Sequence, residues 1–244
     1  MNRMIVAENL NKIFYQGDRI VHAVKDAGLR IGAGERVLIH GPSGAGKSTL
    51  LHVLAGLDRP TSGSVGFRGK EVYRLSDRKR SALRNGCFGF VFQFYHLLPE
   101  LNVLENVMLP AMIKGGERGK EMKRRAVSLL KGVGLADRLK HRPSQLSGGE
   151  SQRTAIARSL MNYTDVLFCD EPAGNLDSEM SEEIYSIIRS ISEERGMSVV
   201  VVSHQAVADD FPHTKYCMKD GVLSKAGEGQ AGEKEIRAAK TLKT

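Results

Sequence analysis

The sequence predicts an α/β fold with a parallel-sheet core, an N-terminal antiparallel β subdomain and a helical subdomain. Two continuous apolar runs, at residues 166–169 and 198–202, are typical of parallel strands that are covered on both faces. Between them, residues 181–195 carry isoleucines at 184, 187, 188 and 191, which is the spacing of an amphipathic helix. A strand, a helix and a strand in this order indicate a parallel sheet.

The other elements follow in chain order. Residues 4–31 mix short β-rich stretches with turn signals at 16–18 and 31–34, which predicts antiparallel strands. Residues 36–40 predict a short buried strand, and residues 48–55 predict the helix after it. Residues 97–160 hold mainly helical patterns, and we expect them to form a helical subdomain inserted in the core. We therefore expect one domain over residues 4–223 and a polar, flexible tail over residues 224–244.

Composition excludes several classes of protein. Apolar residues make up 41% and charged residues 26% of the 244 residues, which argues against disorder, collagen and coiled coil. The cysteines Cys87, Cys169 and Cys217 are odd in number and form no CxxC pair, which argues against a disulfide framework and a cysteine metal site. No apolar run reaches the roughly 18 residues of a membrane-spanning helix, and the N-terminus lacks a signal-peptide pattern. We expect a reducing, cytoplasmic environment.

The net charge of +8 comes from two basic patches. Residues 68–84 carry seven Lys/Arg and two acidic residues, and residues 114–125 carry six and two, so the rest of the chain has a net charge of −1. Patches of this kind are typical of proteins that meet nucleic acid, anionic lipid or a phosphate ligand. Composition by itself does not choose among these partners.

Residues 41–48 fit the phosphate-loop pattern G-x-x-x-x-G-K-[ST] in full, between a predicted strand and a predicted helix. In such a loop the backbone N–H groups and the helix N-terminus hold an anion, Lys47 reaches the β and γ phosphates, and Ser48 offers its hydroxyl to Mg²⁺. A plain glycine-rich turn is the alternative, but the Lys-Ser ending has no purpose in one. The predicted nucleotide-binding residues of this segment are Gly41, Pro42, Ser43, Gly44, Ala45, Gly46, Lys47, Ser48 and Thr49.

Two carboxylates follow the apolar run at residues 166–169. Asp170 is placed to hold Mg²⁺ through water, and Glu171 is a candidate to orient or deprotonate the attacking water. A strand end with two solvated acids is the alternative. Together with the phosphate loop, the pair predicts hydrolysis of a nucleoside triphosphate.

Further motifs make the sequence resemble the ATP-binding cassette (ABC) family of P-loop ATPases. Residues 146–153, Leu-Ser-Gly-Gly-Glu-Ser-Gln-Arg, resemble the signature that distinguishes this family from other P-loop ATPases. Gln93 resembles its glutamine loop, residues 175–177 resemble its D-loop, and His204 resembles its switch histidine. The motifs occur in the family's order over residues 4 to about 223.

The resemblance implies the following roles. The catalytic residues are Lys47, Gln93, Glu171 and His204; the Mg²⁺ ligands are Ser48, Gln93 and Asp170; further contacts to ATP come from Ser147, Gly149 and Asp177. In the family two subunits pair head to tail, so that each ATP lies between the phosphate loop of one and the signature of the other. We therefore expect a second copy of this chain as a partner. A simple helix cap is the alternative role for Ser147.

The family also stacks an aromatic residue of its first β segment on adenine. Phe14 matches that position best, and the neighbouring Tyr15 is the alternative. A core role is the other reading of a strand aromatic. An aromatic ring is the flat partner that adenine needs.

Residues 93–100, Gln-Phe-Tyr-His-Leu-Leu-Pro-Glu, resemble the branch that contains lipoprotein-releasing ATPases and the ATPase part of macrolide exporters, with the former the closer match. The resemblance implies an ATPase subunit that docks on integral membrane permease subunits, with Phe94 and Leu97 as contacts. An ordinary surface loop is the alternative. We expect the subunit to drive release of lipoproteins from the cytoplasmic membrane, on the cytoplasmic side of the bacterial inner membrane.

Other functions stay open. The chain could serve an efflux pump of the macrolide-exporter type or a cell-division complex, or it could be a scaffold whose ATPase is vestigial. A soluble ABC ATPase that acts on nucleic acid is a further alternative, but such members usually join two cassettes or insert long coiled coils. We therefore expect no nucleic-acid partner. We expect the basic patches to contact anionic lipid, with a solvated surface as the alternative.

Overall fold

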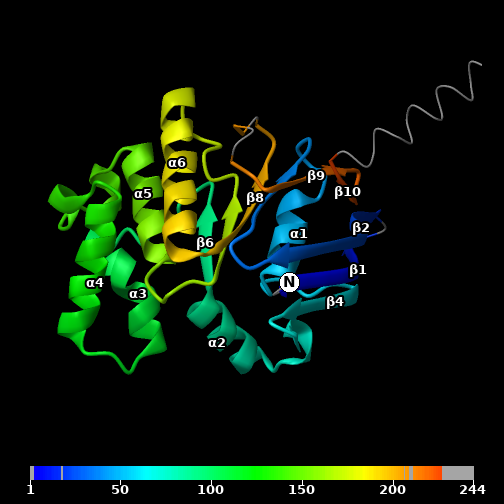
Figure 1. The fold of residues 1–244 in the computed structure, drawn as a ribbon, viewed down its shortest axis with the longest axis horizontal. Coiled ribbons are helices and arrows are strands. Elements are labelled where there is room, and N and C mark those ends of the chain that lie inside the picture. Colours follow the sequence, from blue (N-terminus) through cyan, green and yellow to red (C-terminus); the bar gives the residue numbers. More distant parts are fainter. Residues whose placement is uncertain (1–2, 18, 206, 209–210, 227–244) are drawn as a thin grey trace, which may run out of the picture.

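A computed structural model of the chain describes residues 3–17, 19–205, 207–208 and 211–226. Ten strands form one sheet in the order β5-β4-β1-β2-β10-β9-β3-β8-β7-β6 (Figure 1). The strands are β1 (Arg3–Gln16), β2 (Arg19–Gly32), β3 (Arg36–His40), β4 (Ser62–Phe67), β5 (Lys70–Glu71), β6 (Phe88–Phe92), β7 (Val166–Asp170), β8 (Ser198–Ser203), β9 (Thr214–Lys219) and β10 (Val222–Lys225).

The core of the sheet is parallel. β9, β3, β8, β7 and β6 pair in parallel, which confirms the predicted parallel core. Successive residues of β8 face opposite sides: Val200 packs in the hydrophobic cluster that contains the α1 leucines, and Val199 and Val201 pack in the cluster on the other side. Because both faces of the strand are buried, its four central residues are all valine instead of alternating apolar and polar.

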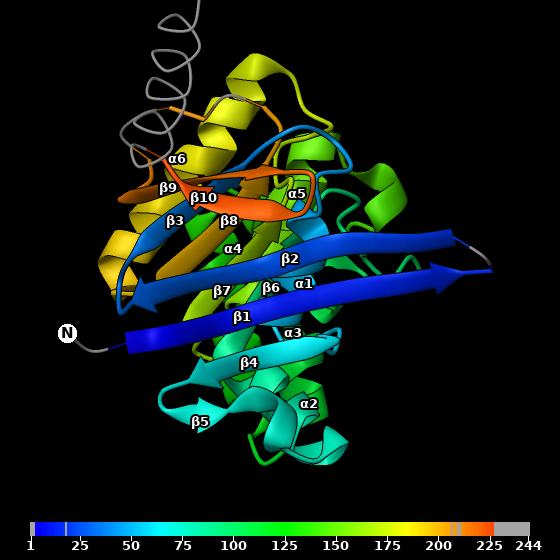
Figure 2. The same ribbon diagram turned by 90° about the vertical axis from the view of Figure 1, so that its right-hand side faces the viewer.

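The N-terminal part is antiparallel, as predicted. β1 and β2 form a long hairpin from Arg3↔Gly32 to Gln16↔Arg19, and β4 pairs on the other edge of β1. Figure 2 shows these strands as a layer that crosses in front of the parallel strands. β2 joins the parallel part through a single pair, Val222↔Lys25, with β10. The paired part of β2 lies next to the phosphate loop, where Ala23 approaches Gly46.

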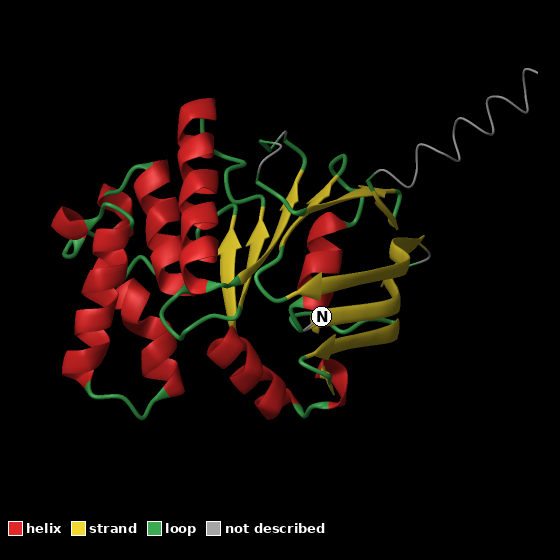
Figure 3. Ribbon diagram, in the orientation of Figure 1, coloured by secondary structure: helices red, strands yellow, loops and turns green. Residues whose placement is uncertain are grey.

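Helices cover both faces of the parallel sheet. α1 lies on the side of the antiparallel layer, and α3 to α6 gather on the other side (Figure 3). α5 packs so closely on β6 that a Cβ at Gly89 would come within 2.6 Å of the Ser159 carbonyl oxygen. The helices are α1 (Lys47–Leu54), α2 (Asp77–Cys87), α3 (Val103–Lys114), α4 (Gly119–Gly132), α5 (Gly148–Ser159) and α6 (Ser178–Arg195), with 3₁₀ turns at Val72–Arg74, Ala136–Arg138 and Pro143–Gln145.

The last strand extends two residues past the predicted domain boundary at residue 223. β10 includes Ser224 and Lys225, which the prediction assigned to the tail, because both residues pair with β9. The predicted tail from residue 227 onward lies outside the described residues. No helix among the described residues combines the length and the apolar character needed to cross a membrane.

Candidate functional site

The phosphate loop connects the end of β3 to the start of α1. Gly46 is the N-cap of α1, with a φ of 101°, and a Cβ there would come within 1.9 Å of the Ala23 carbonyl oxygen. A Cβ at Gly41 would come within 2.0 Å of the Met218 carbonyl oxygen. Only glycine fits at these two positions, because the backbones of β2 and β9 pass against the loop. Packing therefore requires glycine at both Gly41 and Gly46.

Lys47 bends back over its own loop. Its Nζ donates hydrogen bonds to the carbonyl oxygens of Gly41, at 2.9 Å, and Pro42, at 3.0 Å. The same nitrogen lies 3.6 Å from Oε1 of Glu171, and the lysine side chain is 5% exposed. A buried ammonium held by two neutral carbonyls and one carboxylate can exchange these partners for phosphate oxygens. Lys47 thus lies between two carbonyl groups of the loop and the Glu171 carboxylate.

The predicted magnesium residues Ser48 and Asp170 are in contact. The Ser48 hydroxyl donates to Oδ1 of Asp170 at 2.7 Å. Burial raises the pKa of the Asp170 carboxyl, while the Ser48 hydrogen bond and the nearby His52 and Lys47 oppose the rise. Among the described residues no three His, Cys, Asp or Glu side chains gather into a metal site. This donor set fits Mg²⁺, which takes few protein ligands and fills its octahedron with water and substrate phosphate oxygens.

Glu171 and His204 form a pair at the carboxyl ends of β7 and β8. Nδ1 of His204 lies 2.9 Å from Oε2 of Glu171, and the His204 backbone N–H donates to the same oxygen at 3.2 Å. Glu171 has a φ of 49°, a left-handed conformation that disfavours residues with a Cβ, and its N–H donates to the Val202 carbonyl at 3.0 Å. The turn aims the carboxylate toward both Lys47 and His204, so these predicted catalytic groups converge.

Gln93 is held away from this cluster. Its Nε2 donates to Oδ1 of Asn175 at 3.0 Å, and Asn175 Nδ2 donates to the Gln93 carbonyl at 3.1 Å. A Cβ at Gly174 would lie 3.0 Å from Gln93 Nε2, so the amide rests directly on this segment. The predicted magnesium ligand therefore makes its hydrogen bonds with the D-loop in this structure.

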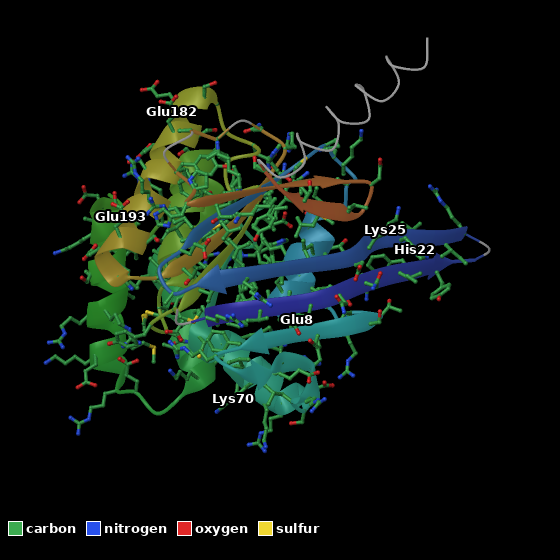
Figure 4. All side chains as sticks on the ribbon, turned by 45° about the vertical axis from the view of Figure 1, so that its right-hand side comes forward. Glu8, His22, Lys25, Lys70, Glu182 and Glu193 are labelled. Carbon is green, nitrogen blue, oxygen red and sulfur yellow. The ribbon has the colours of Figure 1, made fainter. Side chains whose placement is uncertain are left out.

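Phe14 lies at the mouth of the phosphate loop. Its ring lines a cavity together with Gly44, Gly46, Lys47, Ser48 and Thr49, whereas Tyr15 is not among the residues that line it. Phe14 is 37% exposed, and Lys12 Nζ lies 4.8 Å from its ring centroid. His22 and Lys25 of β2 line the same cavity, and Figure 4 labels both on the hairpin. The cavity is open enough for a planar group to enter beside Phe14. The other predicted loop residues lie close by: Pro42 and Ser43 are exposed, and Ala45 is buried with its carbonyl accepting from the Gly221 N–H.

The signature residues lie at the start of α5. Ser147 is the N-cap of this helix and forms a capping box with Glu150. A Cβ at Gly148 would lie 3.2 Å from Leu176 Cδ2, and a Cβ at Gly149 would lie 3.2 Å from Met180 Cε. The third predicted contact, Asp177, caps α6 by accepting from the Met180 N–H at 2.9 Å. These three predicted nucleotide contacts gather at the α5–α6 end, and none of them lines the described cavity at the phosphate loop.

Some functional neighbours were not predicted. His52 Nε2 lies 3.6 Å from Oδ2 of Asp170. Its place four residues after Ser48 on one helix is a signal that could have found it, because residues i and i+4 share a face. Asn175 was predicted only as part of the D-loop motif. Asp220 and Gly221 line the phosphate-loop cavity from the far end of the chain, and no local pattern predicts that contact.

Comparison with known proteins identifies the family of this chain. The model of the ABC transporter family matches residues 24–174. The lipoprotein-releasing system ATP-binding protein LolD of Shewanella denitrificans is 42% identical, over 92% of this chain and 96% of that protein. LolD of Syntrophotalea carbinolica is 50% identical, over 83% of this chain and 89% of that protein.

A solved structure matches the fold over nearly the same length. A dimeric post-hydrolysis state of the ATP-binding cassette MJ0796, bound to ADP and Pi, superposes with a TM-score of 0.84. It is 39% identical and covers 91% of this chain and 98% of that chain. The predicted α/β fold class is confirmed by this match. The chain belongs to the ABC transporter family, and it is an ATP-binding, ATP-hydrolysing subunit of that family.

Proposed function

We propose that this chain is the ATPase subunit of a membrane complex that releases lipoproteins from the cytoplasmic membrane, acting on the cytoplasmic side of the bacterial inner membrane. The observation that carries the proposal is the high identity to two LolD proteins over most of the chain. An efflux pump and a cell-division complex are the alternatives within the same branch. The partner permease determines which substrate is moved.

Two copies pair head to tail around two ATP molecules in this proposal. The gathering of Ser147, Gly149 and Asp177 away from the phosphate loop supports it, because one chain then carries two incomplete halves of a site. The MJ0796 structure, a dimer bound to ADP and Pi, supports the pairing of two copies. In each site Lys47 binds the β and γ phosphates, Phe14 stacks on adenine, and Ser147 and Gly149 of the other copy contact the γ phosphate.

Hydrolysis then uses the cluster at the ends of β7 and β8. Glu171 accepts the proton of the attacking water, and His204, which already contacts Glu171 at 2.9 Å, moves to the γ phosphate. Ser48 and Asp170 would hold Mg²⁺, which would neutralise charge on the phosphates. Gln93 would offer its Oε1 to the same ion, because its hydrogen bonds with Asn175 use Nε2 and the backbone carbonyl.

The Glu171→Gln variant tests the catalytic arrangement. We expect it to bind ATP and accumulate as an ATP-bound dimer, with hydrolysis slowed about 10²- to 10⁴-fold, because general-base catalysis is lost while the site keeps its shape. Size-exclusion chromatography with light scattering, with and without ATP and Mg²⁺, measures the dimer. A variant that stays monomeric with ATP, or that hydrolyses ATP at the normal rate, contradicts the role of Glu171.

The permease docks on the loop after β6 in this proposal. Phe94 is 69% exposed and Leu98 41% exposed, whereas Leu97, the predicted contact, is half-buried, so the exposed leucine is one residue later. Beside the loop, an apolar groove between α2, β6, α3 and α5 is lined by Phe90, Leu109 and Ile113. A short amphipathic helix of a permease fits such a groove.

Replacing Phe94 and Leu98 by Ala tests the docking. We expect the double variant to bind ATP normally and to lose transport in cells, so that lipoproteins accumulate in the inner membrane. Fractionation of inner and outer membranes measures the lipoproteins, and a drug-sensitivity assay on the same cells tests the efflux alternative. Tyr163→Ala, which removes another exposed aromatic side chain, is the control. Normal lipoprotein sorting in the double variant contradicts the proposal.

The basic patches face the membrane in this proposal. α2, the end of α3 and the start of α4 lie together at the lower edge of Figure 1, and Figure 4 shows Lys70 at that edge with Glu182 of α6 at the opposite one. Several exposed cations there form no ion pair among the described residues: Lys70, Arg78, Lys79, Lys120, Lys123 and Arg124. Each Lys or Arg near an anionic leaflet contributes about 1 kcal/mol.

Sedimentation with phospholipid vesicles tests the lipid contact. We expect the chain to bind vesicles of anionic phosphatidylglycerol at low salt, not vesicles of neutral phosphatidylcholine, and to be released at high salt. Arg78→Glu with Lys79→Glu weakens binding, and Lys219→Glu with Arg195→Glu, outside the two patches, leaves it unchanged. Binding that is insensitive to salt or to the first pair of substitutions contradicts the lipid contact.

A further inference from the structure

The loop after β6 contains a turn in a disfavoured conformation. Tyr95 and His96 are consecutive and both left-handed, with φ angles of 59° and 48°. Residues with a Cβ rarely adopt this region, and two in succession are held only when the surroundings compensate. The turn lies between Phe94 and Leu98, the exposed side chains that we assign to permease docking.

Arg158, in the last turn of α5, holds this turn. Its Nη1 donates to the His96 carbonyl at 2.5 Å and its Nη2 to the Tyr95 carbonyl at 2.6 Å. A guanidinium has its donors in a rigid planar fork, so two separate nitrogens hold two successive carbonyls in one defined geometry, whereas a lysine offers all its donors from a single rotatable nitrogen. Arg158 forms no ion pair with an acidic side chain among the described residues, so the two carbonyls are its charge-assisted acceptors.

Tyr95 contacts the opposite end of the same helix. Its hydroxyl lies 3.1 Å from the position that a Cβ on Gly148, the first residue of α5, would take. Gly148 and Arg158 are ten residues apart, or about 15 Å along the helix axis. Helical side chains lean toward the N-terminus, so Arg158 reaches back along α5 toward the turn while the Tyr95 ring reaches forward to the signature. The turn is therefore attached to both ends of α5.

The rest of the loop is also fixed, but to other elements. Asn106 of α3 is fully buried, accepts from the Leu98 N–H at 2.8 Å and donates to the Leu98 carbonyl at 3.1 Å. At the other end Gln93 is bound to Asn175. The Tyr95–His96 turn thus links the exposed side chains directly to the signature helix.

We propose that Arg158 and Tyr95 are positioning residues that couple the docking loop to the signature helix, so that ATP bound at the α5 N-terminus changes the loop presented to the permease. This inference rests on the proposed dimer, in which the signature of one copy contacts the ATP of the other. Neither residue lines the cavity at the phosphate loop. The coupling passes through the two carbonyl hydrogen bonds of Arg158 and the approach of the Tyr95 hydroxyl to Gly148.

Hydrogen exchange measured by mass spectrometry tests the coupling in the Glu171→Gln chain, with and without ATP and Mg²⁺. We expect ATP to protect residues 146–150 and also to change exchange at residues 94–98 by about fivefold or more, because the two segments move together. Adding Arg158→Lys is expected to abolish the change at residues 94–98 while protection at 146–150 and the dimer persist. Tyr95→Ala, which keeps the Tyr95 carbonyl, is expected to reduce the change partially.

Arg125→Lys is the matched control, because Arg125 also donates to a carbonyl, that of Met161, but far from the loop in sequence. It should leave the response at residues 94–98 unchanged. An ATP response at residues 94–98 that is equal in the parent chain and in the chain with Arg158→Lys overturns the inference and leaves the proposed function standing. If ATP gives neither a dimer nor protection at 146–150 in the parent chain, the proposed dimer fails, and the inference fails with it.

Discussion

The two glycine-containing helix starts of this chain, α1 and α5, differ in what fills their first turns. α1 has Gly46 as its N-cap, and no side chain accepts hydrogen bonds from the N–H groups of its first turn. α5 begins at Ser147, whose hydroxyl accepts from the Glu150 N–H while the Glu150 carboxylate accepts from the Ser147 N–H. The backbone hydrogen bond from Ser147 and the Arg138 guanidinium lower the pKa of Glu150 and keep it ionised.

The two helix starts are therefore not equivalent anion sites. α1 has a cation, a hydroxyl and two carboxylates around it, which is enough to bind and act on a phosphate with a metal. The first turn of α5 is capped by Ser147 and contains the acidic Glu150, so this helix offers a phosphate only a few hydrogen-bond donors and no cation. The α5 end complements a nucleotide that another copy already holds, and changes at the two ends should have separable effects.

Of the changes at the two helix starts, Lys47→Ala is expected to have the largest effect. Loss of the cation that contacts Gly41 O, Pro42 O and Glu171 should reduce kcat by about 10²- to 10³-fold, because developing charge on the phosphates loses its fixed positive partner. A phosphate-release assay at saturating ATP measures the rate. Lys140→Ala, an exposed lysine elsewhere, is the control. A hydrolysis rate within a few-fold of normal would show that the phosphate loop supports hydrolysis without the Lys47 cation.

Ser147→Ala should act only on the second end. We expect ATP binding to the isolated chain to stay normal, and ATP-dependent dimer formation and hydrolysis to fall about 10- to 100-fold, because one hydrogen bond to a charged group contributes about 1.5–3 kcal/mol. Equilibrium binding of a fluorescent ATP analogue and steady-state hydrolysis separate the two.

Asn102→Ala is the matched control for Ser147→Ala. Asn102 forms the same kind of capping box with Glu105 at the start of α3. Both substitutions should lower the free energy of unfolding by about 1 kcal/mol, since each removes a helix cap. Equal hydrolysis in the two variants would mean that Ser147 is a cap and nothing more.

Phe14→Ala should weaken ATP binding by about tenfold, since stacking of a base on an aromatic ring contributes about 1–3 kcal/mol. Tyr15→Ala should leave the affinity unchanged, because Tyr15 does not line the cavity at the phosphate loop. Isothermal titration calorimetry with ATP measures both. The reverse order of effects would reassign the adenine contact to Tyr15.

The smallest effect is expected for Asn175→Ala. Removing the side chain that accepts from Gln93 Nε2 lets the amide turn its Oε1 toward Mg²⁺, so the Mg²⁺ concentration for half-maximal hydrolysis should fall by about two- to tenfold, the value of one neutral hydrogen bond. Gln93→Ala should raise the same midpoint. An unchanged midpoint in both variants would remove Gln93 from the metal site.

Local sequence patterns were sufficient to predict much of the site. The phosphate loop, the Asp170–Glu171 pair and His204 each follow a short apolar run, and the carboxyl ends of parallel strands meet at one edge of a sheet, so their convergence follows from strand order. The continuous apolar runs at 166–169 and 198–202 were sufficient to predict strands buried on both faces. Motif spacing also predicted a helix at each glycine-rich segment.

Contacts between distant segments were beyond local patterns. The positions of Asp220 beside the phosphate loop and of Asn175 against Gln93 depend on how β9, β10 and the D-loop pack, and no periodicity encodes that packing. The exposure of Leu98 instead of Leu97 depends on the Tyr95–His96 turn, whose two left-handed residues are not ones that typically signal such a turn. These placements come from tertiary contacts.

The chemistry of this protein is encoded in local motifs: a phosphate loop, a carboxylate pair and a signature, in residue types that few other functions require. Which of these groups meet within one chain depends on the packing of the whole fold. Lys47, Glu171 and His204 converge because the strands that precede them are neighbours in the sheet. Ser147 and Asp177 instead cap α5 and α6, which pack on the opposite face of the sheet from α1. Motifs encode local backbone geometry, whereas the distance between motifs is set by the packing of a buried parallel sheet.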